Sequence, residues 1–296
     1  MKILEKLIKS KVINIAGFLL SITLIVFLGH EFYISKGASY LFDFSLSQYL
    51  FVSVSIFVYC LCIFLSSFNW MLLFNQSHNI EILNAHLLTI FWKYLPTNFL
   101  HFVGRHLYLN SIIGNKKILT SNMLEIFFIL SSAIIVFLFS MIFFNMELPY
   151  IGNISYIQIF FFFLFFGLIN LLFILKRKLF DYKKLLVINL NYLFFHVLSS
   201  LSFVFLWMIF IDSDISLIGI LRVIAIYLVG WIFGFITIGS PAGIGVREGV
   251  YLILFQPMVE SQGILLAFLL IARISHVLAE SIMFFIAYYL REKWVY

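Results

Sequence analysis

The sequence predicts an all-α polytopic membrane protein that forms one domain over residues 1–296. Hydrophobic residues make up 64% of the chain and charged residues only 11%, and the mean hydropathy is +1.11. A soluble domain is nearer about half apolar and about a quarter charged. Several apolar runs also exceed the roughly 18 residues that a bilayer-crossing helix needs. A β-barrel would instead show alternating segments of about 10 residues.

We expect seven or eight transmembrane helices. The stretch 246–260 would be the eighth, although about 15 residues give only about 22 Å of helix against a hydrocarbon core of about 30 Å. Residues 81–118 are too polar for a simple span and too apolar for a simple loop, which predicts an interfacial helix followed by a re-entrant segment. The other seven spans are expected at about 12–30, 49–74, 119–145, 155–175, 185–211, 219–239 and 263–290.

Basic residues predict the orientation. They cluster in the N-terminus, in region 75–118 and in the loop near 176–184, whereas the loops between these regions are acidic or neutral. This alternation predicts a cell-membrane protein with a cytoplasmic N-terminus. The C-terminus is cytoplasmic only if 246–260 also crosses. The net charge of +6 therefore indicates topology and contact with anionic lipid headgroups rather than a nucleic-acid partner.

Helix-breaking residues interrupt the apolar pattern twice, at about 94–106 and 240–256. Open backbone groups are tolerated at membrane depth only where they face protein or a water-filled cavity. Paired interruptions in the two halves of a membrane protein point to a central site and to internal pseudo-symmetry. Each interruption couples Pro and Gly with an arginine, Arg105 in the first and Arg247 in the second.

The motifs at these breaks are similar to those of a known family. The second reads Pro241-Ala242-Gly243-Ile244-Gly245-Val246-Arg247-Glu248, and the first contains Leu95-Pro96-Thr97-Asn98 and Gly104-Arg105. Together with Arg273 in the last long helix, they resemble the lysylphosphatidylglycerol synthase transmembrane region, a flippase-like integral membrane family. Ala242 and Thr97 stand where the family has glycine. The resemblance implies movement of anionic or aminoacylated lipids, or of lipid-linked glycan precursors, between leaflets, without the aminoacyl-transferase domain of bifunctional members.

The second break has the chemistry of an anion site. A helix that starts near Pro241 or Gly243 points backbone N–H groups and a positive dipole end into the break. Glycines let a headgroup approach the backbone, and an arginine fork matches a phosphate. The competing interpretation is that Arg247 and Glu248 are interfacial charges that snorkel to the membrane surface. We expect the substrate-binding residues to be Arg105, Pro241, Gly243, Gly245, Arg247, Glu248, Arg273 and Glu280.

Further ionisable residues are secondary candidates. Arg273, His276 and Glu280 share one face of the last helix, where they form either a transport path or a structural polar network. His101 lies one turn before Arg105 and is either the second wall of an anion site or an interface anchor. Glu125 is placed to pair with Arg105 or Lys117, and His196 belongs to a polar stripe suited to hydrogen bonds between helices. The secondary candidates are therefore His101, Glu125, His196 and His276.

The leading functional hypothesis is a lipid or lipid-linked glycan flippase of the cytoplasmic membrane. The alternatives are an integral-membrane transferase and a non-catalytic partner of the enzymes of cell-envelope glycan or lipid synthesis. The sequence has no P-loop pattern, no zinc-ligand spacing and no Gly-x-Ser-x-Gly elbow. We therefore expect no catalytic residue, metal or cofactor, and transport that runs downhill, by ion coupling or by a partner's energy. Membrane lipids with anionic or lipid-linked headgroups are the expected partners.

Overall fold

The computed structural model describes residues 45–74, 79–95, 99–143, 182–211 and 215–294, with seven scattered residues between 23 and 34. Within these residues all regular structure is helical. Five helices, α3, α6, α8, α9 and α11, are long and apolar enough to cross a membrane, which confirms the all-α membrane class. The predicted span at 155–175 and most of that at 12–30 lie outside the described residues. The elements are α3 (Leu46–Leu72), α4 (Asn79–Leu88), η2 (Ile90–Tyr94), α5 (Leu100–Leu109), α6 (Asn115–Phe143), α8 (Tyr182–Phe210), α9 (Leu217–Ile236), η3 (Pro241–Gly243), α10 (Val246–Phe255), η4 (Gln256–Met258) and α11 (Gln262–Trp294).

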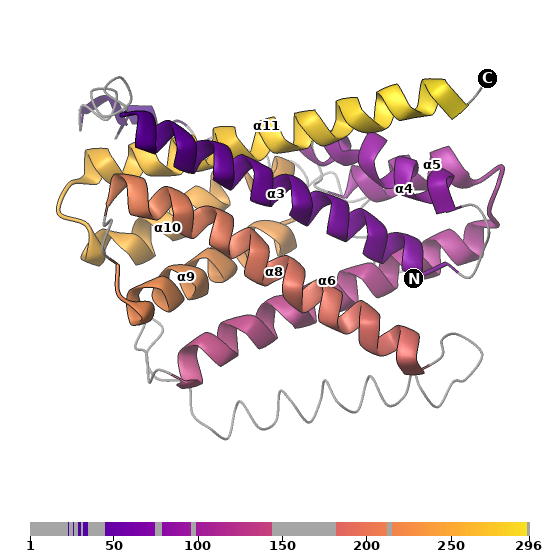
Figure 1. Cartoon of the computed structure of the whole chain (residues 1–296), viewed down its shortest axis with the longest axis horizontal. Helices are drawn as coiled ribbons and strands as arrows, with labels where there is room; N and C mark the ends of the chain where they lie inside the picture. The colour runs from indigo at the N-terminus through magenta and orange to yellow at the C-terminus, as the bar shows by residue number, and fades with distance from the viewer. Residues whose placement is uncertain are drawn as a thin grey trace.

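Antiparallel packing of α3 against α8 defines the two ends of the molecule (Figure 1). Near the start of α3, Gln48 Nε2 donates to the carbonyl oxygen of Ile209 at 3.5 Å, close to the end of α8. Beyond the end of α3, Lys184 Nζ donates to the carbonyl oxygen of Phe74 at 3.3 Å, near the start of α8. We call this second end the Lys184 end, and the end that holds the α8–α9 connection the Ser216 end.

Two helical hairpins enter the bundle from opposite ends. The α4–η2–α5 hairpin follows α3 and precedes α6 at the Lys184 end, beside the C-terminal part of α11 (Figure 1). The α9–η3–α10 hairpin begins and finishes at the Ser216 end, because the chain before α9 and the chain after α10 line one cavity there. The two tips, η2 and η3, are in contact. The breaks that the sequence singled out therefore meet inside the molecule.

The helix α4 differs from the interfacial helix that the sequence suggested, because it is buried within the bundle. Ile82 and Ala85 are 0% exposed. Polar residues in and just after α4 have partners inside the bundle: Thr89 Oγ1 donates to the carbonyl oxygen of Ala85 at 2.7 Å, and His86 joins a buried ionic network. The polarity of the segment thus reflects an internal site rather than a water-facing surface.

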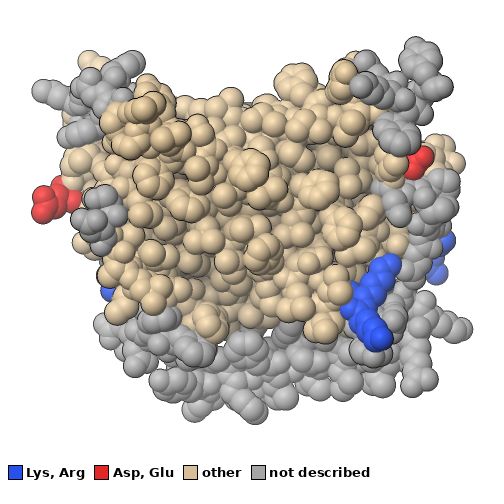
Figure 2. Space-filling view, in the orientation of Figure 1, with Lys and Arg blue, Asp and Glu red and all other residues tan. Residues whose placement is uncertain are grey.

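The outer surface carries many exposed apolar side chains, among them Phe57 and Phe64 of α3 and Phe285 of α11. One face of the molecule is apolar across its middle, and the charged side chains visible in that view lie toward its edges (Figure 2). Such an extended apolar surface is unfavourable in water but matches the hydrocarbon region of a bilayer. This surface is therefore suited to contact with lipid.

Candidate functional site

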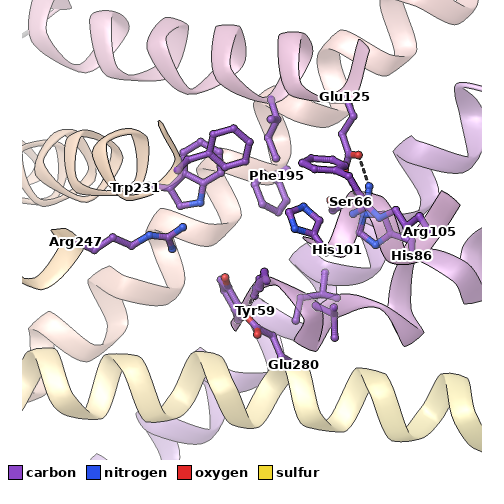
Figure 3. Close-up of a pocket in the computed structure, with 16 residues that line it drawn as sticks. Tyr59, Ser66, His86, His101, Arg105, Glu125, Phe195, Trp231, Arg247 and Glu280 are labelled. Carbon is purple, nitrogen blue, oxygen red and sulfur yellow. Dashed lines mark hydrogen bonds and ion pairs between the residues drawn. The ribbon is translucent and has the colours of Figure 1, made fainter. Parts of the chain in front are cut away.

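A cavity of about 120 Å³ lies where the two hairpins meet the long helices (Figure 3). Its charged lining consists of Lys93, Arg105 and Arg247, with Glu125 and Glu280 as the carboxylates. His86 and His101 also contribute to the wall. Among the described lining residues, three cations thus share the cavity with two carboxylates, and the way in which these charges pair decides what the cavity can bind.

The break before α10 is shaped by four backbone positions with positive φ within seven residues. Gly239, Ala242, Gly243 and Gly245 have φ values of 94°, 49°, 71° and 83°. These conformations suit glycine because it has no Cβ. At the start of α10 the backbone N–H of Gly245 donates to Glu248 Oε2 at 2.7 Å. Glu248 therefore caps the helix and holds the turn against it.

Arg247 extends from the first turn of α10 into the cavity (Figure 3). Its stem crosses two glycines so closely that a Cβ on Gly234 would lie 2.3 Å from Arg247 Cγ, and one on Gly243 would lie 2.7 Å from Nε. The guanidinium carbon lies 5.8 Å from the centre of the Trp231 ring. Within the described part of the chain Arg247 forms no ion pair or hydrogen bond, and its Nε is buried. It is the unpaired cation of the cavity.

Arg105 faces the same cavity from α5, but it has a partner. Its Nη1 donates to Glu125 Oε2 of α6, and both side chains are 5% exposed. Glu125 Oε1 also lies 3.3 Å from His86 Nε2, and His86 Nδ1 lies 2.9 Å from Ser67 Oγ. This network ties α3, α4, α5 and α6 together around one carboxylate.

Glu280 of α11 holds the tip of the first hairpin. Its Oε1 accepts a hydrogen bond from Lys93 Nζ at 2.6 Å, and its Oε2 accepts one from the Tyr94 hydroxyl at 2.9 Å. In the sequence, Lys93 is one of the basic residues of region 75–118 that predict orientation, and Tyr94 is not among the predicted site residues. Their one signal was a lysine set between two aromatic residues within an apolar stretch.

Arg273 contacts both hairpin tips. Its Nη2 donates to the carbonyl oxygen of Ala242 at 3.3 Å, and its guanidinium carbon lies 5.6 Å from the centre of the Tyr94 ring. Its Nη1 lies 3.9 Å from Glu248 Oε1. Arg273 and Glu280 share one face of α11 but have different hydrogen-bond partners: Glu280 binds the first hairpin, and Arg273 donates to the second.

The remaining candidates have more varied places. His276 stacks on Tyr59 with ring centres 3.9 Å apart, and its Nε2 has no hydrogen-bond partner among the described residues. His196 Nε2 hydrogen bonds to the carbonyl oxygen of Ile129 at 2.8 Å, which is a contact between helices. Pro241 begins η3, and His101 lines the cavity. The early turn at Pro96–Asn98 lies outside the described residues.

The arrangement suits non-covalent binding of an anion. A phosphate or carboxylate beside Arg247 would complete the charge balance of the cavity, because the other two cations already have carboxylate partners. No protein-family model, curated protein or solved structure matches this chain.

Proposed function

We propose that this protein moves an amphiphile with an anionic headgroup, either a phospholipid or a lipid-linked saccharide, between the leaflets of the cell membrane. The observation that carries the proposal is the unpaired Arg247 in a cavity surrounded by membrane-type helices. An unpaired charge at membrane depth is costly and is typical of a substrate or ion path. The first turns of α5 and α10 also line the cavity, and their dipoles favour an anion.

We also propose that the two hairpins are re-entrant and that they relate the halves of the chain as inverted repeats. The order helix–hairpin–helix occurs in α3 to α6 and again, in the opposite direction, in α8 to α11. Transporters built from inverted repeats place their substrate near the bilayer midplane, where discontinuous helices meet. Motion of one half against the other would expose the cavity to each leaflet in turn.

Charge supports a cytoplasmic location for the Lys184 end. Lys116, Lys117 and Lys183 lie near this end, whereas Glu260 lies at the Ser216 end. Basic residues are retained on the cytoplasmic side. Since α10 returns the chain to the Ser216 end and α11 then runs to the Lys184 end, the C-terminus is cytoplasmic in this arrangement.

Residues that resemble the flippase-like family lie at the break before α10, where they position Arg247. Gly243 makes room for Arg247, Gly245 opens the α10 turn and Glu248 caps it. These three residues of the motif thus help to position Arg247. We propose on this ground that the chain shares the activity of that family.

Reconstituted vesicles provide the test. Fluorescent phosphatidylglycerol and undecaprenyl phosphate are the two probes, and the measurement is the rate at which each probe changes leaflet. We expect the wild-type protein to accelerate at least one probe and Arg247→Gln to remove most of that rate. Lys116→Gln is the matched control, because Lys116 is exposed and does not line the cavity. The proposal fails if neither probe is accelerated, or if Arg247→Gln transports as well as the wild type.

A further inference from the structure

We infer that a second cavity, between α10 and α11, holds the hydrocarbon chain of the transported amphiphile while its anionic group occupies the site at Arg247. This inference rests on the proposed function and specifies its ligand. It assigns the two chemical parts of one molecule to two different cavities, and it makes the Glu248–Arg273 pair the boundary between them.

The second cavity has a volume of about 280 Å³. Among the described residues its charged lining consists only of Glu248 and Arg273. An apolar cavity is a poor site for water or a soluble ion, and it favours an apolar guest. The apolar residues that form its wall are Phe32, Ile244, Leu266, Leu269 and Leu270.

A small void of about 20 Å³ lies between the two cavities and shares lining residues with each of them. Arg247 borders this void and the polar cavity, whereas Glu248, Leu269 and Arg273 border this void and the apolar cavity. The void has room for about one water molecule. The three spaces therefore follow one another, from a charged chamber, through the Glu248–Arg273 pair, to an apolar chamber.

The Glu248–Arg273 pair is suited to open without leaving either residue unpaired. Its N–O distance of 3.9 Å is long for an ion pair. Glu248 would keep its bond to the backbone N–H of Gly245, and Arg273 would keep its bond to the carbonyl of Ala242. An incoming phosphate also competes with Glu248 for Arg273. Passage of an amphiphile across this boundary is therefore compatible with the contacts around it.

The adjacency of a charged and an apolar cavity favours a hydrocarbon chain attached to the anion as the occupant. A free phosphate uses the Arg247 site alone and gains nothing from the apolar walls. Each CH₂ that an attached chain buries contributes about 0.8 kcal/mol, which is about fourfold in affinity. Affinity should therefore rise with chain length only while the apolar cavity is open.

A series of soluble phosphates tests this inference. Equilibrium binding of inorganic, butyl, hexyl and octyl phosphate is measured on the full chain in nanodiscs. We expect a rise of up to about fourfold per added CH₂ for the wild type. Leu270→Trp, which fills the apolar cavity from a side chain that is 40% exposed, should flatten the rise and leave binding of inorganic phosphate unchanged. Ile282→Trp, on an exposed α11 residue away from the cavities, is the matched control and should keep the rise.

The two proposals fail in different ways. If inorganic phosphate does not bind, or binds Arg247→Gln as tightly as wild type, the headgroup site and the proposed function are refuted. If inorganic phosphate binding depends on Arg247 but the chain-length rise is equal in Leu270→Trp and wild type, only the chain site is refuted. Partition of alkyl phosphates into the nanodisc lipid affects all three proteins equally, so it cannot produce a difference between them.

Discussion

Ala242 and Gly243 are neighbours in the same left-handed turn, yet exchanging alanine and glycine at these two positions should have unequal effects. Ala242 has φ 49° and ψ 24°, and Gly243 has φ 71°. An L-residue in this region costs about 1–2 kcal/mol relative to the right-handed helix. At Gly243 an added Cβ would also lie within 3 Å of neighbouring atoms.

For Ala242→Gly the favourable and unfavourable contributions to the free energy of unfolding nearly cancel. The variant removes about 1–2 kcal/mol of backbone strain, but it adds about 0.4–1 kcal/mol of chain entropy to the unfolded state. It also removes a buried methyl group, which contributes about 0.8 kcal/mol. We expect the free energy of unfolding to stay within about 1 kcal/mol of wild type.

For Gly243→Ala the contributions do not cancel. The new methyl group would lie 2.9 Å from the Cα and the carbonyl oxygen of Gly234 and 2.7 Å from Arg247 Nε. Overpacking of this kind costs about 1–3 kcal/mol, and the left-handed backbone conformation costs alanine about 1–2 kcal/mol more. The lower entropy of the unfolded chain offsets about 0.4–1 kcal/mol of this loss. The expected loss is about 1–4 kcal/mol. Binding of inorganic phosphate should also weaken, because Arg247 is displaced.

Chemical unfolding in mixed micelles, followed by circular dichroism, measures both variants. Gly114→Ala is the control, because a Cβ there meets nothing within 4 Å, and it should leave stability and phosphate binding unchanged. If Gly243→Ala unfolds and binds phosphate like wild type, a glycine at this position is not needed to make room for Arg247 beside Gly234.

Three further variants probe the packing around the site. Glu125→Gln keeps the shape but leaves buried Arg105 without its counter-charge, so unfolding free energy should fall by about 3–5 kcal/mol. Gly230→Ala places a methyl group 2.1 Å from the Tyr251 ring and should cost about 1–3 kcal/mol by overpacking α9 against α10. Ser55→Ala removes a buried hydroxyl pair, at 2.9 Å, between α3 and α8. Its cost should be only about 1 kcal/mol, since such bonds in membranes are weak. Unfolding in mixed micelles checks all three, and a loss for Ser55→Ala that exceeds the loss for Glu125→Gln would contradict this ranking.

The sequence predicted the long helices well because length and apolarity are sufficient signals for them. The predicted span 49–74 corresponds to α3 (Leu46–Leu72), and 219–239 corresponds to α9 (Leu217–Ile236). The starts differ because polar caps, Ser45 and Ser216, begin these helices outside the apolar windows. A cap adds no hydrophobicity, so a pattern based on apolar residues begins too late.

The pairing of charges was less predictable. Helical spacing placed Arg273 and Glu280 on one face, but seven residues correspond to about 10.5 Å along a helix. That separation favours partners on other elements, and Glu280 instead binds Lys93 and Tyr94 of η2. The partners come from the hairpin tips, which meet only in the folded molecule. The periodicity of one helix carries no information about that contact.

Three arginines of the predicted site illustrate what only the three-dimensional arrangement distinguishes. Arg105 is paired with a buried carboxylate, and Arg273 joins the two hairpin tips, whereas Arg247 has room made by two glycines and has no partner among the described residues. All three are arginines beside helix breaks or in apolar helices, so their sequence contexts are alike. The carboxylate next to Arg247 in the sequence, Glu248, caps α10 and pairs with Arg273, so it does not neutralise Arg247. An anion from outside the chain is the partner that this arrangement leaves room for.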